Sequence, residues 1–149
     1  MLEYIIMLIY LDNCCYNRPF DDQTQLKIQL ESQAKLAIQA ALRNGLYELA
    51  WSYILDYENS RNPYIEKREA ISPWKQIAKI DIQQETEAIL SYAERLRTRG
   101  IKTFDSLHIA CAVAAGCDYF LSTDRKILNT PVPEVKIANP IQFIMEVAL

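Results

Sequence analysis

The sequence is short of the residues from which zinc sites and disulfide frameworks are built. It has a single histidine, His108, and none of its four cysteines pairs with another at the C-x-x-C spacing of a zinc motif. Cys14 and Cys15 are adjacent, and a chain with this much hydrophobic content does not need disulfides for stability. We therefore expect the thiols to be reduced, small, buried side chains.

Long apolar runs and an excess of positive charge are also absent. The longest uncharged apolar run, Tyr4 to Leu11, has eight residues, against the roughly 20 that a membrane-spanning helix needs, and no small-residue cleavage site follows it. We expect a soluble, cytoplasmic protein that does not bind membranes. With 16 Lys and Arg against 19 Asp and Glu, the net charge is -3, so a polyanion would have to be held by a local site.

The composition is that of a folded domain. The chain has 149 residues, of which 50% are hydrophobic and 23% are charged. These values exclude a disordered tail and predict one domain spanning residues 1–149.

Short apolar runs alternate with longer helical segments along the chain. Strands are predicted at 4–11, 47–51, 80–82, 119–121 and 135–138. Helices are predicted at 23–43, from a Ser52 cap to 60, at 84–99, at 103–115 and from Pro140 onward, with a further helical pair set off by Pro63 and Pro73. This alternation predicts an α/β fold with a mainly parallel sheet covered by helices on both faces.

Acids that directly follow strands are the first candidates for a functional site. Asp12 follows the first strand and Asp124 follows the fourth, and ligand sites in parallel sheets lie at the carboxyl ends of the strands. Asp105 lies in the first turn of the apolar helix 103–115, where the helix dipole favours a carboxylate. For Asp105 alone, this stabilising role is as good an explanation as a functional one.

Glu58 is the most informative acid because of its place on a helix. It shares a core-facing stripe with Ile54 and Leu55, whereas Asp56 points elsewhere. A glutamate on a packed face requires a partner, and no Lys or Arg lies at a spacing that would neutralise these acids. Oxygen ligands without His or Cys suit Mg²⁺ or Mn²⁺. Four clustered acids would contribute -4 to the net charge of -3, which leaves +1 for the rest of the molecule.

Three segments in this order resemble the PIN-domain family, which includes the toxin ribonucleases of VapC type. The segments are Ile9-Tyr10-Leu11-Asp12-Asn13-Cys14-Cys15-Tyr16-Asn17-Arg18-Pro19, Thr103-Phe104-Asp105-Ser106-Leu107-His108-Ile109-Ala110 and Leu121-Ser122-Thr123-Asp124. The resemblance extends from Leu8 to about Ile144. It departs from the commonest family pattern at Thr123, where an Asn often precedes the final Asp.

The resemblance implies a fold, an activity and a set of partners. The fold is a three-layer α/β/α sandwich, and the activity is Mg²⁺- or Mn²⁺-dependent cleavage of phosphodiesters, usually in RNA. Homodimers are frequent in the family, and its toxins pair with a small antitoxin. Carried over by motif, the metal-binding acids are Asp12, Glu58, Asp105 and Asp124.

Other polar residues have a functional and a plain structural interpretation. Arg18, Arg125 and Lys126 could contact RNA phosphates or belong to an ordinary solvated face. Asn13 and Ser122 could orient the metal ligands or cap local backbone.

His108, one helical turn after Asp105, could approach the substrate or be a hydrogen-bonded core histidine, and the second is the commoner case. The tyrosines 10, 16, 47, 53, 57 and 64 could stack bases or fill the core. The cations 95, 97, 99 and 102 could form a polyanion patch or complement a helix C-terminus, and Asp21 and Asp22 are expected to cap a helix.

Three functions from different classes remain open at this point. The first is a metal-dependent endoribonuclease that acts as the toxin of a type II toxin–antitoxin pair. The second is a catalytically silent PIN-fold module for RNA processing or protein interaction, against which the presence of all four acids argues. The third is a phosphoryl-accepting receiver domain, which would need adjacent acids after the first strand, where this sequence has Asp12 and Asn13.

Overall fold

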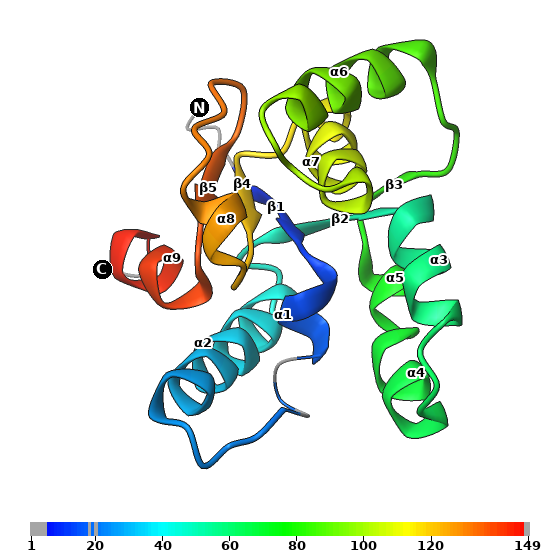
Figure 1. Cartoon of the computed structure of the whole chain (residues 1–149). Helices are drawn as coiled ribbons and strands as arrows, with labels where there is room; N and C mark the ends of the chain where they lie inside the picture. Colours follow the sequence, from blue (N-terminus) through cyan, green and yellow to red (C-terminus); the bar gives the residue numbers. More distant parts are fainter. Residues whose placement is uncertain (1–5, 18, 20, 148–149) are drawn as a thin grey trace, which may run out of the picture.

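A sheet of five short parallel strands forms the centre of the molecule (Figure 1). The computed structural model describes residues 6–17, 19 and 21–147. The strands are β1 (Leu8–Leu11), β2 (Glu48–Ser52), β3 (Ile80–Ile82), β4 (Tyr119–Leu121) and β5 (Lys136–Ala138), in the spatial order β3-β2-β1-β4-β5. Each neighbouring pair is parallel.

The strand order reverses between β1 and β4. From β1 the chain adds β2 and then β3 on one side, and it returns to place β4 and β5 on the other side. Ile9 of β1 is paired with Leu49 of β2 and with Tyr119 of β4. The carboxyl ends of β1 and β4 are therefore adjacent at a topological switch point, where parallel sheets bind ligands.

Helices cover both faces of the sheet (Figure 1). Helices α6 and α7 pack together on one face, and α2 and α9 pack together on the other. The helices are α1 (Asn13–Asn17), α2 (Leu26–Arg43), α3 (Tyr53–Ser60), α4 (Ile65–Ile71), α5 (Trp74–Ile77), α6 (Glu87–Thr98), α7 (Thr103–Ala115), α8 (Arg125–Leu128) and α9 (Pro140–Val147). The predicted α/β/α sandwich is confirmed. Within the described part of the chain, no helix is long and apolar enough to cross a membrane.

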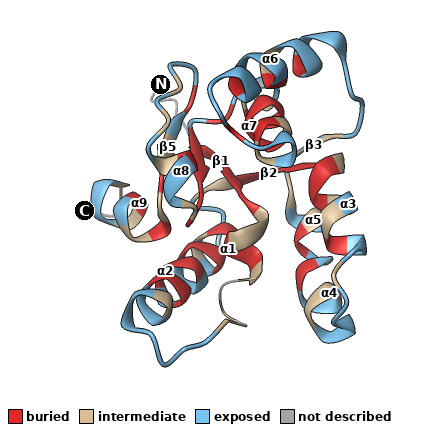
Figure 2. Cartoon of the chain, viewed as in Figure 1, coloured by how far each residue is buried: buried red, intermediate tan, exposed pale blue. Residues whose placement is uncertain are grey.

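The core lies along the sheet and the inner sides of its helices (Figure 2). All four residues of β1 are buried, because the strand is covered on both faces, and this explains why its sequence is continuously apolar. Tyr10 of β1 stacks on Phe120 of β4, with ring centroids 5.3 Å apart. The four cysteines are free thiols, as predicted, and only Cys14 is partly exposed.

Local signals fix several of the helix ends. Ser52 caps α3, as predicted, by accepting a hydrogen bond from the Leu55 amide. Thr86 caps α6 in the same way through the Ile89 amide, so this helix begins at Glu87 rather than at the predicted residue 84. Helix α7 ends at Gly116, whose φ of 76° is the left-handed conformation that glycine adopts without a Cβ clash.

The first strand and the first long helix also begin later than predicted. Strand β1 begins at Leu8, where pairing with Glu48 starts; of the predicted residues 4–7, residues 4 and 5 lie outside the described part of the chain. Helix α2 begins at Leu26 rather than at residue 23. The Asp22 carboxylate accepts hydrogen bonds from the Thr24 amide and hydroxyl, so it closes a turn ahead of the helix and does not cap α2.

Two short helices were not predicted, and each follows one of the acids at the strand ends. Helix α1 begins directly after Asp12, and α8 begins directly after Asp124, whose carboxylate accepts hydrogen bonds from the amides of Lys126 and Ile127. Each has only one turn, too short for an apolar periodicity to be visible in the sequence.

Asp56 belongs to a hydrogen-bond network that fixes α3 to its neighbours. Its carboxylate accepts hydrogen bonds from Trp51 Nε1 (2.9 Å), Lys75 Nζ (2.8 Å) and Gln83 Nε2 (3.0 Å). Partial burial favours a higher pKa for Asp56, but the hydrogen bonds from Lys75, Trp51 and Gln83 outweigh it and lower the pKa.

We predict that Asp56→Asn lowers the free energy of unfolding by about 1 kcal/mol at pH 7, because the charged acceptor of three donors is lost from a partly solvated site. Since the pKa of Asp56 is lowered in the folded state, its contribution is present above pH 4 and is lost as the pH falls through the folded-state pKa. Urea unfolding of both proteins at pH 7 and at pH 3 measures the difference. An equal difference at both pH values would contradict this explanation.

Candidate metal centre

Two of the predicted acids, Asp12 and Asp124, lie at the switch point between β1 and β4. Asp12 is 4% exposed. The Ser122 hydroxyl joins the two acids, because it donates to Asp12 Oδ2 at 2.9 Å and accepts from the Asp124 amide at 3.0 Å. Ser122 therefore fixes the loop after β4 to the acid after β1.

The Asp12 carboxylate is held by several donors. Oδ1 accepts a hydrogen bond from the Asn13 amide (2.7 Å), and Oδ2 accepts one from the Cys14 thiol (3.3 Å) as well as the one from Ser122. Burial raises the pKa of Asp12 well above its ordinary value. A cation at this position would offset that effect, because an adjacent positive charge favours the ionised carboxylate.

Glu58 of α3 contacts His108 of α7 across the site. His108 Nε2 donates to Glu58 Oε1 and lies 4.0 Å from Asp12 Oδ1. The other ring nitrogen, Nδ1, is 2.6 Å from the Tyr10 hydroxyl, which is itself 2.6 Å from Ser52 Oγ. When the ring is neutral and Nε2 carries the hydrogen that faces the carboxylate, Nδ1 accepts a hydrogen bond from the Tyr10 hydroxyl.

The His108 side chain is completely buried, as expected for a core histidine. Burial lowers its pKa, but the hydrogen bond to Glu58 and the negative charges of Asp12 and Asp105 raise the pKa above its ordinary value overall. Glu58 thus has the partner that its position on the helix requires, and this partner is a histidine rather than a Lys or Arg.

Asn13 connects Asp12 to Glu58. Its backbone amide donates to Asp12, and its side-chain Nδ2 donates to Glu58 Oε2 at 3.3 Å. Its side-chain Oδ1 is buried and has no hydrogen-bond partner among the described residues. A buried carbonyl oxygen without a partner is costly, so a water or a cation bound to this atom would stabilise the site.

Asp105, at the start of α7, lines a hollow of about 130 Å³ beside Asp124. Lys102 and Lys126 also line this hollow. Burial raises the pKa of Asp105, and the negative charges of Asp124 and Glu58 raise it further. Asp105 therefore interacts electrostatically with the other three acids, each of which comes from a separate segment of the chain.

The structure brings Asp12, Glu58, Asp105 and Asp124 to the same end of the sheet. Asp56, the neighbouring acid that the helical stripe argued against, is turned away into its network with Trp51 and Lys75. Among the described residues, no three His, Cys, Asp or Glu side chains lie close enough, as they stand, to hold a metal ion. The acids stand apart because their like charges repel one another. Two of them are also held by other contacts, since Glu58 is bonded to His108 and Asp124 caps α8.

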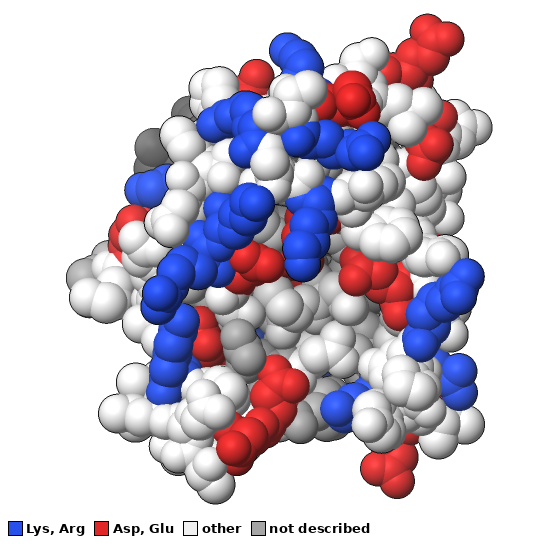
Figure 3. Space-filling view, in the orientation of Figure 1, with Lys and Arg blue, Asp and Glu red and all other residues white. Residues whose placement is uncertain are grey.

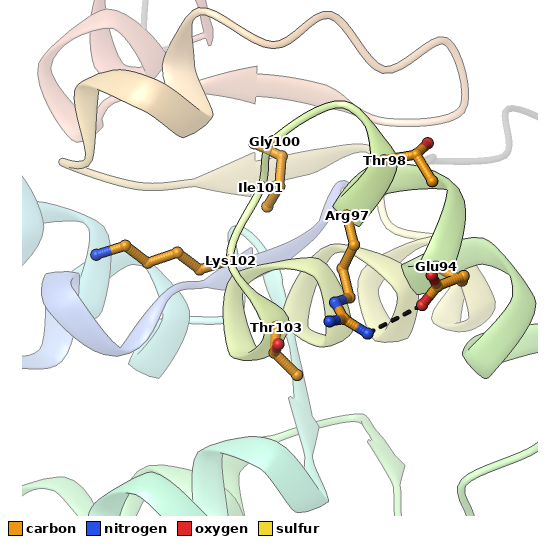
Figure 4. Close-up of a pocket in the computed structure, with 7 residues that line it drawn as sticks. All are labelled: Glu94, Arg97, Thr98, Gly100, Ile101, Lys102 and Thr103. Carbon is orange, nitrogen blue, oxygen red and sulfur yellow. Dashed lines mark hydrogen bonds and ion pairs between the residues drawn. The ribbon is translucent and has the colours of Figure 1, made fainter.

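Basic side chains lie along one side of the hollow in which acidic side chains are visible (Figure 3). Of the three cations predicted to contact RNA, Lys126 lines the hollow with Asp105 and Asp124, and Arg125 is exposed beside it on α8. Arg18 lies outside the described residues. Lys102 lies at the edge of a second hollow, of about 340 Å³, at the junction of α6 and α7, where its side chain extends away from the Arg97–Glu94 ion pair (Figure 4).

Sequence reasoning missed several polar residues around the acids. The sequence predicts His108 near the substrate or in the core, and Tyr10 in the core or stacked on a base, but neither prediction includes the hydrogen-bond chain that ends on Glu58. Cys14, which donates to Asp12, was treated only as an inert thiol. The position of His108 one helical turn after Asp105 was the only signal in the sequence, and nothing in its surroundings indicated a partner on α3.

The donors that surround this site fit a hard divalent cation. They are carboxylate oxygens from Asp12, Glu58, Asp105 and Asp124, with the buried Asn13 Oδ1 beside them, and such oxygens suit Mg²⁺ or Mn²⁺. These four acids are the residues that would hold the ion.

Comparison with known proteins places the chain in a family. The family model described as PIN domain matches residues 9–132. The chain belongs to the PIN-domain family. PIN domains are nucleases, and membership excludes the receiver-domain hypothesis. No curated protein matches the chain.

A solved structure supports the PIN fold independently. VapBC2 from Rickettsia felis, crystallised bound to a DNA fragment from its promoter, matches with a TM-score of 0.55 at 16% sequence identity. The match covers 89% of this chain and 98% of the chain in that structure.

We predict that Ser122→Ala weakens Mn²⁺ binding by about 10-fold or more, because Asp12 loses a donor that orients it. Mn²⁺ titration followed by isothermal calorimetry and by the rise in melting temperature measures the effect. The matched control is Ser106→Ala, since Ser106 is a fully buried serine whose hydroxyl donates to the Ile101 carbonyl instead. Equal Mn²⁺ affinities in the two variants would contradict the orienting role.

Proposed function

We propose that this PIN-domain protein is a metal-dependent endoribonuclease that hydrolyses RNA phosphodiesters with Mg²⁺ or Mn²⁺. The observation that carries the proposal is the convergence of Asp12 and Asp124, joined through Ser122, with Glu58 and Asp105 at the switch point of the sheet. One buried carboxylate, Asp12, with three partly buried ones beside it destabilises a protein that has no use for a cation, because the like charges repel one another.

The acids and the substrate phosphate are both negatively charged, so the carboxylates alone cannot bind the phosphate. The four acids would hold a divalent cation, whose chemistry there would be to offset the negative charge of the phosphate and to activate a water for attack on phosphorus. The residues of this chain hold and orient the acids: Asn13, Cys14 and Ser122 fix Asp12, and His108 fixes Glu58.

Positive charge beside the acids supports the choice of a polyanionic substrate. Lys102 and Lys126 line the hollow next to Asp105, and Arg125 is exposed on the adjacent helix. These cations would contact phosphates on either side of the cleaved bond, so substrate binding would weaken as the salt concentration rises.

We predict that the protein cleaves single-stranded RNA in the presence of Mn²⁺, that EDTA abolishes cleavage, and that Asp12→Ala lowers the rate by about 100-fold or more. Asp56→Asn is the matched control, because Asp56 lies two residues from Glu58 but faces a different network. Gel analysis of a labelled oligonucleotide gives the rates. Absence of cleavage by the wild-type protein would support a catalytically silent PIN module, and unchanged cleavage by Asp12→Ala would exclude the proposed metal centre.

The same proposal includes a cellular role as the toxin of a type II toxin–antitoxin pair in the cytoplasm. Its support is the resemblance to VapC-type toxins and the structural similarity to VapBC2. An RNA substrate, a small antitoxin partner and a homodimer all belong to this proposal.

If the protein is a toxin, we predict that its expression alone arrests growth and that Asp12→Ala relieves the arrest. Co-expression of a short open reading frame adjacent to its gene should restore growth and form a complex that co-purifies with the protein. Colony counts after induction provide the measurement. Normal growth on expression of folded, RNA-cleaving protein would contradict the toxin role while leaving the nuclease proposal intact.

A further inference from the structure

Two exposed aromatic side chains stand in contact beside the acids. The ring centroids of Tyr57 and Phe104 are 5.3 Å apart with an interplanar angle of 34°. Tyr57 is 42% exposed and Phe104 is 44% exposed. Each ring comes directly before one of the site acids, Glu58 on α3 and Asp105 on α7.

Helix geometry explains why rings and acids lie next to one another. Successive residues of an α-helix point about 100° apart, so a helix that directs its carboxylate into the site places the preceding side chain at the rim. Helices α3 and α7 pack against each other. In each of them, the residue before the site acid is aromatic. The result is one patch of two rings, contributed by two helices, at the edge of the acidic site.

The patch differs from the other aromatic contacts near the sheet. Tyr10, Tyr16 and Phe120 are completely buried and stabilise the core. Tyr57 and Phe104 leave much of their apolar surface in water, so core packing does not explain them. Exposed apolar surface rimmed by polar groups marks binding sites.

Two cations, Arg61 and Lys102, accompany the two rings. The Arg61 guanidinium lies over the Tyr57 ring, with Cζ 4.9 Å from the centroid. Lys102 lies two residues before Phe104 and lines the hollow that contains Asp105. Aromatic rings combined with cations are the surface that single-stranded nucleic acids require, since rings stack on bases and cations contact the backbone.

We propose that Tyr57 and Phe104 form a stacking platform for one unpaired nucleobase of the substrate strand, within a few nucleotides of the cleaved bond. This inference rests on the proposed nuclease function and adds to it the two residues that would bind an unpaired base of the RNA strand. A base inside a duplex is already stacked on its neighbours, so the platform discriminates against paired substrate. The cations around the rings favour a nucleic acid over an apolar protein segment as the occupant.

The test uses Tyr57→Leu and Phe104→Leu, which keep apolar volume but remove the ring, in the full-length protein. We expect KM for a single-stranded RNA oligonucleotide to rise at least about fivefold in each variant, with kcat changed less than twofold, because a lost base stack is worth a fivefold or greater change in affinity. Tyr64→Leu is the matched control, since Tyr64 is also exposed and carries a cation, Lys67, over its ring, but lies outside the site. Its KM should be unchanged.

Substrates that lack a single base identify the nucleotide that stacks. For the wild-type protein, removing the base at one position near the cleavage site should raise KM as much as Phe104→Leu does. Removing the same base should have no further effect on that variant, because the two changes eliminate the same contact. Unchanged KM in both leucine variants, or base removal that is tolerated at every position by the wild-type protein, would overturn the proposal.

A binding experiment separates this proposal from the nuclease proposal. An oligonucleotide carrying 2-aminopurine at the stacking position should lose fluorescence on binding to the wild-type protein in EDTA, and the quenching should be lost in both leucine variants. Quenching without cleavage when Mn²⁺ is added would refute the nuclease proposal alone. Cleavage without quenching would refute the platform alone. Leucine variants that lose antitoxin binding but keep the wild-type KM for RNA would assign the rings to a protein partner and overturn the proposal.

Discussion

The burial of Asp12 between β1 and β4 is the constraint on which the rest of the site depends. A carboxylate that is only 4% exposed is unfavourable unless donors surround it, and the chain supplies them from both sides of the switch point. Asn13 and Cys14 follow β1, and Ser122 follows β4. The strand order β3-β2-β1-β4-β5 is what makes these two segments neighbours, so fold and site are determined together.

A second buried network holds the opposite side of the site. The chain of contacts from Ser52 through Tyr10 and His108 to Glu58 crosses from β2 and β1 to α7 and α3. Polar groups buried in this way are stabilising only when each one is satisfied, so His108 keeps a fixed orientation between its two partners. Glu58 is thereby held near Asp12 by the core of the protein rather than by its own helix alone.

The sequence was sufficient for those features that depend on local pattern. Short, mainly apolar segments located the strands, with 80–82 and 119–121 matching β3 and β4 in both bounds, and the placement of Asp12 and Asp124 after strands located the end of the sheet where the site lies. The helical stripe separated Glu58 from Asp56. Contacts between distant segments could not be predicted in this way. The His108–Glu58 contact depends on how α7 packs against α3, and the one-turn helices α1 and α8 depend on backbone hydrogen bonds next to Asp12 and Asp124.

The roles of Tyr57 and Phe104 at the edge of the site could not be predicted from local sequence pattern either. Tyr57 is one of several tyrosines that could stack bases or fill the core, and its sequence neighbourhood does not distinguish these roles. The distinction comes from its exposure, from its contact with Phe104 and from the guanidinium of Arg61 over its face. Because adjacent residues on α3 and on α7 point in different directions, each helix contributes a carboxylate to the interior of the site and a ring to its edge. Packing these two helices together therefore places a charged centre suited to a cation beside an apolar surface suited to a base, and a single-stranded nucleotide has the chemistry to engage both.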